Sequence, residues 1–171
     1  MKGFSNSRKN RFLQSLPTSS IETSDIAARC SFNFSYFEAN QDAGQNFDEW
    51  SDSQGASSLA TLLDKIKNYT KEPLSYWRNE RAGSGGLKVL TNYEQFPKKS
   101  HFSHPPHVPH DVIWSRFRLS NMVRLIGFVI PANIAGKIYT DPKGNQYRFD
   151  SNTFYVVFLD RDHQFFQTEQ A

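Results

Sequence analysis

The chain has little cysteine, no long apolar run and little net charge. Cys30 is the single cysteine among 171 residues, so no disulfide can form within the chain. No stretch approaches the ~20 apolar residues that a membrane-spanning helix needs, and the N-terminus lacks the apolar segment of a secretion signal. The formal charge of +3 is far below that of a histone-like protein. These absences predict a cytoplasmic protein that makes no contact with a membrane.

Aromatic residues, by contrast, are abundant. The 15 Phe, 7 Tyr and 3 Trp make up 15% of the chain, and aromatic side chains favour β-strands and broad packing surfaces. A length of 171 residues is sufficient for one domain with its own hydrophobic core. Cys30 lies in an alternating run with Phe32 and Phe34, which predicts a buried, unreactive thiol.

The first 25 residues differ in composition from the rest. They are rich in Ser, Asn and Thr and carry a small basic group, Arg8, Lys9 and Arg11. This composition predicts a flexible arm over residues 1–25, followed by a single domain over residues 26–171. A basic arm can contact nucleic acid, and a terminus without such a role is the alternative.

Apolar spacing predicts two helices. The apolar residues of the first recur at the intervals of one helical face: Leu59, Leu62, Leu63 and Ile66. Ser57 or Ser58 can cap its start. The second begins near Thr70, holds Pro73 in its first turn and stops at the glycines from Gly83 onward. The polar stretch before the first helix, residues 39–55, is predicted to be a loop that aromatic residues attach to the core.

Alternating apolar residues separated by turns predict the strands. They cover residues 29–38, 87–90, 112–119, 123–130, 138–139, 147–149 and 154–159. Short turns at 120–121 and 141–144 predict two hairpins. The last strand is apolar on both faces, as expected of a central strand with helices on one side. The predicted fold is α+β: a single domain with a twisted, mainly antiparallel sheet, two helices packed on one face and a flexible N-terminal arm.

Arginines on the middle strands are the main candidates for a binding site. Alternation places Trp114, Arg116 and Arg118 on the face opposite to Phe117, which is expected to face the core. Arg124 begins the next strand and is expected to join them. Clustered guanidinium groups can hold a phosphate and stabilise the charge of a phosphodiester transition state, and Trp114 can stack on a base. Pairing of these arginines with Asp or Glu across strands is the alternative.

His163 follows the last strand, between Asp162 and the Phe165-Phe166 pair. A histidine can act as general acid or base near neutral pH. Metal-independent RNA cleavage needs a base, an acid and cations, and the candidates are His163, His110 and the arginines. A purely structural His163 is the alternative, as is a cation site formed by Asp160 and Asp162.

Four histidines recur at every third position: His101, His104, His107 and His110. The prolines between them favour polyproline II, which would line the imidazoles along one edge at intervals of about 9 Å. The ligands of one zinc ion all lie about 2 Å from it, so a straight run cannot form a tetrahedral site. We therefore predict an ordered, exposed loop without metal or cofactor. A bent loop that brings two imidazoles together, beside a carboxylate such as Asp111, is the alternative.

The order of these elements resembles that of the RelE/ParE-like superfamily of bacterial toxins. A helix pair precedes an antiparallel sheet with arginines on its middle strands and a late histidine, and the likeness covers roughly residues 59–166. The blocks Arg124-Leu-Ile-Gly-Phe128 and Phe154-Tyr-Val-Val-Phe-Leu-Asp-Arg-Asp-His163 are also similar to uncharacterised bacterial proteins encoded near mobile elements. The first strand and the 138–149 hairpin are additions to the toxin pattern.

The resemblance implies an RNA-binding, toxin-type ribonuclease that needs no metal. Its substrate would be RNA on the ribosome, and a cognate antitoxin-like protein would be a second partner. The positions that it singles out are Arg116, Arg118, Arg124 and His163. The alternative function is a non-enzymatic interaction or regulatory module from a bacterial mobile element. An exposed apolar patch, together with arginines that are fully paired with carboxylates, would favour that alternative.

Overall fold

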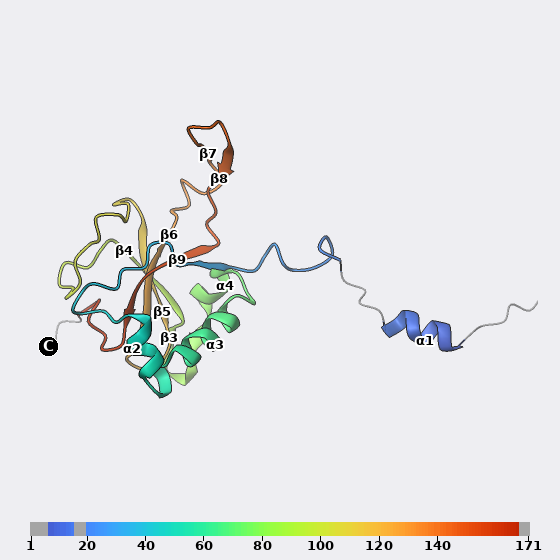
Figure 1. Cartoon of the computed structure of the whole chain (residues 1–171), viewed down its shortest axis with the longest axis horizontal. Helices are drawn as coiled ribbons and strands as arrows, with labels where there is room; N and C mark the ends of the chain where they lie inside the picture. Colours follow the sequence, from blue (N-terminus) through green and yellow to red (C-terminus); the bar gives the residue numbers. More distant parts are fainter. Residues whose placement is uncertain (1–6, 16–19, 168–171) are drawn as a thin grey trace, which may run out of the picture.

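A five-stranded sheet with the order β1-β9-β6-β5-β4 organises the chain (Figure 1). The computed structural model describes residues 7–15 and 20–167. The strands of this sheet are β1 (Ser31–Asn33), β4 (Leu90–Glu94), β5 (Ile113–Arg118), β6 (Arg124–Val129) and β9 (Thr153–Asp160). Only β1 and β9 run parallel, and the other neighbouring pairs are antiparallel. The prediction of an α+β fold with a mainly antiparallel sheet is confirmed.

The longest strand, β9, lies inside the sheet between β1 and β6, as its apolar sequence predicts. Its pairing with β6 shifts register between Ile126 and Gly127. A Cβ atom on Gly127 would lie 2.1 Å from the carbonyl oxygen of Tyr155. The strands therefore approach so closely at this point that only glycine fits.

Three helices, one more than predicted, pack on one face of the sheet. They are α2 (Phe47–Asp52), α3 (Leu59–Tyr69) and α4 (Leu74–Asn79), which lie together in the lower part of Figure 1. Their large apolar side chains, including Trp50, Leu62 and Trp77, are buried in one cluster with Phe117 and Phe154 of the sheet. We call this side the helix-covered face.

The helix boundaries follow from capping residues. The Ser58 side chain accepts a hydrogen bond from the backbone N–H of Thr61 and so caps α3, as predicted. Thr70 ends α3 rather than starting the next helix, and Pro73 stands just before α4. Helix α2 lies within the predicted 39–55 loop. It forms because Asn46 and Glu49 make a capping box and Trp50 is fully buried.

Irregular segments, rather than helices, cover the opposite face. Buried side chains of the 95–112 loop and of the turn after β9, among them Phe102, Val108 and Phe165, pack there against Trp114 and Phe158 of the sheet. This loop-covered face carries a dense aromatic cluster. Both faces of the sheet are therefore buried, and the prediction of an open face around Trp114 is wrong.

Two small hairpins complete the domain. One joins β2 (Arg81–Ala82) to β3 (Leu87–Lys88), and the other joins β7 (Ile138–Thr140) to β8 (Gln146–Arg148). Short 3-10 turns lie at Gly55–Ser57 and Gly83–Gly85. The β7–β8 hairpin turns at 141–144, as predicted, and projects away from the sheet in Figure 1. The predicted strand at 29–38 is reduced to β1, and the one at 87–90 is divided between β3 and β4.

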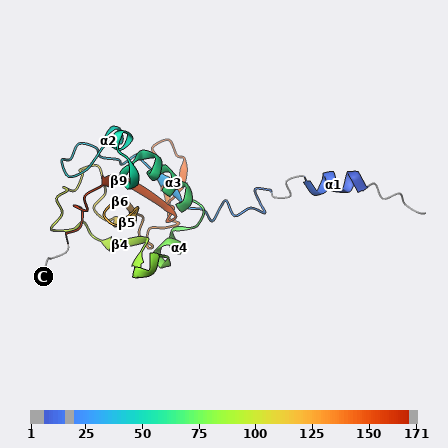
Figure 2. The ribbon, with the colours of Figure 1, turned by 90° about the horizontal axis from the view of Figure 1, so that it is seen from below.

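The predicted arm contains a helix, α1 (Ser7–Ser15), which Figures 1 and 2 show apart from the sheet. Arg8 and Arg11 are exposed on it. The rest of the predicted arm is described only from residue 20 onward, and residues 1–6 and 16–19 lie outside the described part. Within the described ranges, no helix is long and apolar enough to cross a membrane.

Candidate anion site at the end of the loop-covered face

The three predicted arginines converge at one end of the loop-covered face. Arg118 and Arg124 are direct cross-strand partners on β5 and β6, and Arg116 points to the same side two residues earlier. Arg124 also lies opposite Asp160, the last residue of β9. The charges of Arg116 and Arg118 both act on Arg124 and on His163. The sequence did not predict whether the arginines and His163 converge; in the structure they lie close enough for their charges to interact.

Arg124 holds the β5–β6 turn together. It is only 3% exposed, and it donates hydrogen bonds to the carbonyl oxygens of Ser120 (2.7 Å), Asn121 (2.8 Å) and Val123 (2.9 Å). Burial, followed by the charges of Arg116 and Arg118, lowers the pKa of Arg124 to about 10. This burial leaves little of Arg124 open to a ligand, and its predicted contact with RNA stays a prediction. The side chain stabilises the turn and adds charge from beneath the surface.

Arg118 and Arg116 are more loosely held. The Arg118 guanidinium lies 3.3 Å and 3.4 Å from the carbonyl oxygens of Ser120 and Asn121, and its Nε atom is buried without a hydrogen-bond partner. Burial is the main cause of the lowered pKa of Arg118. Arg116 donates to the carbonyl oxygen of Lys88 at 3.4 Å and to the hydroxyl of Tyr93. Neither guanidinium makes the three short backbone contacts that Arg124 makes, although the Nε atom of Arg124 is also buried without a partner.

Asp160 is the carboxylate nearest to this cluster, but its oxygens are already engaged. One accepts from the backbone N–H of Gln164 at 2.8 Å and the other from that of Phe165 at 3.0 Å. Burial raises the pKa of Asp160. Among the described residues, the ion pairs are Asp25–Arg29 and Arg161–Asp162, neither of which includes the clustered arginines. The alternative of full cross-strand pairing with carboxylates is therefore not what the structure shows.

His163 lies at the edge of the cluster, in a left-handed backbone conformation with φ of +58°. Burial and the charge of Arg124 lower its pKa, and the opposing effect of Asp160 is smaller. The imidazole is consequently neutral at pH 7 and able to accept a proton. The nearby Arg161–Asp162 pair is exposed, so Asp162 faces water rather than the cluster.

Two aromatic side chains beside the arginines were not predicted as site residues. Tyr93 of β4 stacks on Phe166, with ring centroids 4.9 Å apart and an interplanar angle of 8°. Phe166 is 38% exposed, and its neighbour Phe165 is buried in the aromatic cluster. The sequence signal for this arrangement is the Phe165-Phe166 pair just after His163, because only one of two adjacent side chains can point into the core.

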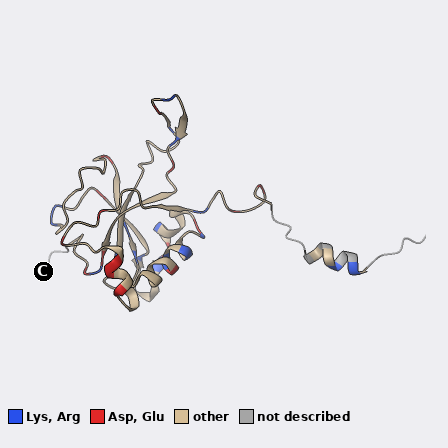
Figure 3. Cartoon of the chain, viewed as in Figure 1, with Lys and Arg blue, Asp and Glu red and all other residues tan. Residues whose placement is uncertain are grey.

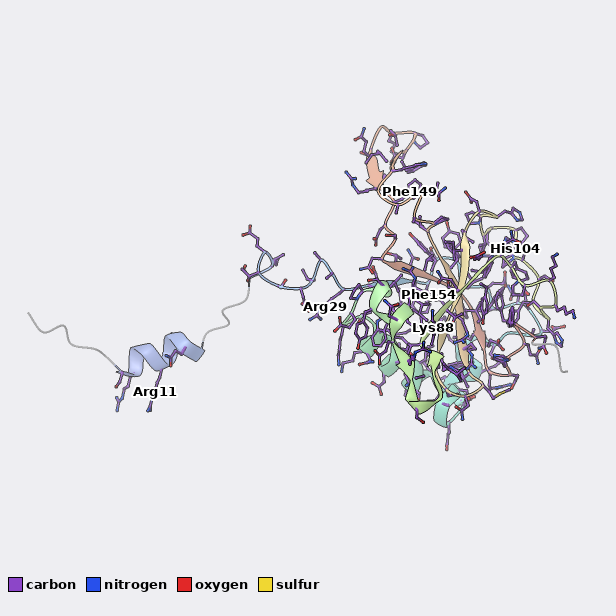
Figure 4. The ribbon with its side chains drawn as sticks, turned by 180° about the vertical axis from the view of Figure 1, so that it is seen from behind. Arg11, Arg29, Lys88, His104, Phe149 and Phe154 are labelled. Atoms are coloured by element: carbon purple, nitrogen blue, oxygen red, sulfur yellow. The ribbon has the colours of Figure 1, made fainter. Side chains whose placement is uncertain are left out.

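Trp114 and His110 do not belong to this site. Trp114 is 1% exposed and packs between Phe96 and Phe165, so it has no face open to a base. His110 stacks on His104 with ring centroids 4.5 Å apart. Figure 4 shows His104 well away from Lys88, whose carbonyl contacts Arg116. The prediction that Trp114 offers a face to a base is wrong, whereas RNA binding by the exposed His110 stays a prediction, at a place apart from the arginines.

The histidine loop bends instead of forming a straight ladder. Val108 closes a turn onto Pro105, which brings His104 and His110 together. His101 and His107 are exposed, and His107 contacts the carbonyl oxygen of Tyr36. Among the described residues, no group of three or more His, Cys, Asp or Glu side chains is arranged to hold a metal ion. The loop is therefore bent, as in the alternative prediction, and the bend brings together two imidazoles, those of His104 and His110.

Arg118 also lines a cavity of about 470 Å³ between the helices and the β5–β6 turn. Lys65, Arg81 and the acidic Glu80 also border it, together with two asparagine amides. Figure 3 shows acidic residues along α2 and basic residues on α3, so basic residues do not cover one whole side of the molecule. The positive charge is local, at and beside Arg118.

No protein-family model, curated protein sequence or solved structure matches this chain. The likeness to the RelE/ParE-like toxins therefore stays a prediction from the order of elements.

Proposed function

We propose that the chain binds RNA at the arginine cluster and cleaves it without a metal ion. One observation supports this proposal above the others. Three guanidinium groups lie close enough for their charges to act on one another, and Asp160, the carboxylate opposite Arg124, is already hydrogen-bonded to backbone N–H groups. Partly buried cations without an ion partner are costly, and a bound phosphate would offset that cost. Arg118 and Arg116 retain N–H groups that can donate hydrogen bonds to a phosphate, and the planar guanidinium group matches the geometry of phosphate oxygens.

The neighbouring side chains fit cleavage of a phosphodiester. His163, kept neutral by burial, would take the proton of the 2′-hydroxyl that attacks phosphorus. The arginines would stabilise the negative charge that develops on the phosphoryl oxygens. Tyr93, whose pKa is raised by burial, keeps its proton at neutral pH and is placed beside Arg116 to donate it to the leaving oxygen. Tyr93 thus replaces His110 as the candidate acid.

Binding is tested with labelled single-stranded RNA by fluorescence anisotropy at several salt concentrations. Arg118→Gln is expected to weaken binding about tenfold, as the loss of a charged hydrogen bond does. It should also reduce the salt slope by about 0.7, the value of one phosphate contact on a single strand. Arg29→Gln is the matched control, because Arg29 is exposed and already paired with Asp25. Equal affinity of wild type and Arg118→Gln would contradict the proposed site.

Cleavage is tested separately, so that binding and chemistry are distinguished. His163→Gln should bind the same RNA with near-wild-type affinity and cleave it far more slowly, and a chelator should leave wild-type cleavage unchanged. Induced expression in a bacterial host should arrest growth, and His163→Ala or Arg118→Ala should relieve the arrest at equal soluble levels. Loss of cleavage in the presence of a chelator would contradict a metal-independent reaction. Undiminished cleavage by the His163→Gln variant would contradict a catalytic role of this histidine.

One observation favours the alternative, a non-enzymatic protein-interaction module. A second cavity, of about 430 Å³, lies near the base of the β7–β8 hairpin and has mostly apolar walls, including Phe128, Pro131 and Ile134. Such a surface can accept an apolar segment of an antitoxin-like protein. Absence of RNA binding by the folded wild-type protein would favour this function over the first.

A further inference from the structure

The β7–β8 hairpin presents an aromatic face that the arginine site does not use. Tyr139 and Tyr147 are direct cross-strand partners, and alternation places Phe149 on the same side. The ring centroid of Tyr139 lies 6.4 Å from those of both Tyr147 and Phe149. Tyr139 is 49% and Tyr147 55% exposed, although tyrosine is a residue that folded proteins usually bury in part. The hairpin projects from the sheet in Figure 1, with Phe149 near its base in Figure 4.

Hydrogen bonds hold this aromatic face in a defined shape. The carboxylate of Asp141 accepts from the backbone N–H groups of Lys143 and Asn145, each at 2.9 Å. Gly144 adopts a φ of +86°, which closes the turn. At the base, the backbone of Phe149 bonds to Lys137 and to Gly136. A rigid platform of this kind loses little conformational entropy when a ligand stacks on it.

The charges of the hairpin select the kind of partner. Two exposed cations, Lys137 and Lys143, accompany the aromatic residues, and the one acidic residue between them is Asp141. Arg148 lies on the other face of the hairpin and donates to the carbonyl oxygen of Gly136. The hydrogen bonds of the Asp141 carboxylate go to the backbone N–H groups of Lys143 and Asn145 and to the Asn145 side chain, and none goes to a cationic side chain. Ile138 is the one large aliphatic side chain that is exposed on β7 and β8. Tyrosine rings among cations suit the base faces and phosphates of nucleic acid better than an aliphatic protein surface.

We propose that the β7–β8 hairpin is a second contact for single-stranded RNA, an inference that rests on the proposed function for its ligand. Tyr139 and Tyr147 stack on unpaired bases, while Lys137 and Lys143 neutralise the adjoining phosphates. A single strand is required because the faces of bases inside a duplex are already stacked on one another.

The position of the hairpin gives this contact a length requirement. The hairpin leaves the sheet after Val129 and returns before Thr153, whereas the arginine site lies at Arg124 and Asp160, the other ends of the same strands. Five residue steps of about 3.4 Å separate these ends of β6, a span on the order of 17 Å. One strand that reaches both contacts gains affinity by avidity, and a short one does not.

The test compares a 12-nucleotide and a 2-nucleotide single-stranded RNA, with wild type, the double variant Tyr139→Ala/Tyr147→Ala, and the matched control Tyr139→Phe/Tyr147→Phe. The alanine variant is expected to bind the 12-mer about tenfold more weakly, the scale of lost base stacking. The phenylalanine variant keeps the rings and should bind as wild type does. The dinucleotide, held at the arginine site, should bind all three equally. Near-ultraviolet circular dichroism verifies the fold, since both tyrosines lie outside the core.

The outcomes separate this inference from the proposed function. If the alanine variant binds the 12-mer like wild type while Arg118→Gln is weakened, the hairpin contact is overturned and the arginine site stands. If the alanine variant is weakened and Arg118→Gln is not, the hairpin contact stands and the arginine site fails. Equal losses in the alanine and phenylalanine variants would overturn stacking, because the hydroxyl groups would then be the contacts. Equal affinity of wild type for single-stranded and duplex 12-mers would also overturn it.

Discussion

The two faces of the sheet are equally buried but are covered in different ways. On the helix-covered face, regular elements satisfy their own backbone groups, and the side chains between them are apolar. Cys30 and Tyr69 donate there to the backbone carbonyls of Tyr69 and Arg118, and Arg78 of α4 has a buried Nε atom without a partner. On the loop-covered face, irregular segments bring histidines and the arginine cluster to the edge of an aromatic core. Coverage by loops thus brings a larger group of charged and ionisable side chains to the edge of the core than coverage by helices does, and the candidate chemistry lies on that side.

The largest expected effect contrasts a glycine of the sheet with a glycine of the loop cover. A Cβ atom on Gly127 would meet the carbonyl of Tyr155 at 2.1 Å and the ring of Phe154 at 2.7 Å, and neither a backbone group nor a buried ring can withdraw. Gly127→Ala is expected to lower the free energy of unfolding by more than about 4 kcal/mol, or to prevent folding. Soluble expression and urea unfolding measure this.

Gly44→Ala is the matched control on the loop-covered face. The added Cβ would lie 3.1 Å from the ring of Phe102, a contact that a shift of a few tenths of an ångström relieves. The expected loss is about 1 kcal/mol, the lower end for an overpacked core. A Gly44→Ala variant as damaged as Gly127→Ala would mean that the loops are no more adaptable than the strands, and the contrast between the faces would fail.

A smaller difference is expected for truncation of one phenylalanine in each core. Phe117 lies on β5 between fixed strands and packs on Phe32, Tyr69 and Phe154. Phe117→Ala should cost about 4 kcal/mol of unfolding free energy, because the surrounding helices and strands cannot close the cavity. Phe102 comes from the loop, so Phe102→Ala should cost less, about 3 kcal/mol, as the loop moves inward. Urea unfolding of both variants measures the difference, and the reverse order of the two losses would contradict it.

Periodicity predicted the parts of the fold that depend on local pattern. The helix at 59–69, the turns at 120–121 and 141–144 and the central position of β9 follow from the spacing of apolar and turn residues. Helix α2 escaped prediction because its six residues are mostly polar and are held by Trp50, a contact made across the fold. The parallel pairing of β1 with β9 also joins segments more than 100 residues apart, which no local pattern encodes.

The candidate site was predicted only in part, because some of its contacts join segments that are far apart in the sequence. Alternation correctly placed Arg116, Arg118 and Trp114 on one side of β5, but it does not reveal what covers that side. The aromatic loop residues bury Trp114, whereas the other end of the same face stays accessible around Arg118. The roles of Tyr93 and Phe166 depend on pairing of β4 with β5 and on the turn after β9, so spacing along the chain does not reveal them.

The smallest expected effect is a difference in pH dependence between the faces. His104 and His163, both beside the loop-covered core, have lowered pKa values, chiefly through burial. A histidine whose pKa is lower in the folded than in the unfolded state contributes stability that is present above pH 6.5 and is lost as the pH falls. Cys30 and Tyr69, with pKa values raised to about 11 and about 12, contribute stability that is lost only as the pH rises above 9 and 10. Acid should therefore weaken the loop-covered side, and alkali the helix-covered side.

Urea unfolding midpoints at pH 7.5 and 5.0 measure the acid branch. Wild type should lose stability over this interval, and the double variant His104→Gln/His163→Asn should lose less; asparagine suits the left-handed backbone at position 163. His101→Gln, at an exposed histidine, is the control and should behave as wild type does. The effect is small because water screens half-buried imidazoles, and because Asp160, whose pKa is raised, opposes it by gaining stability as the pH falls. A double variant with the wild-type slope would show that neither histidine senses the loop cover, and the contrast would then rest on packing alone.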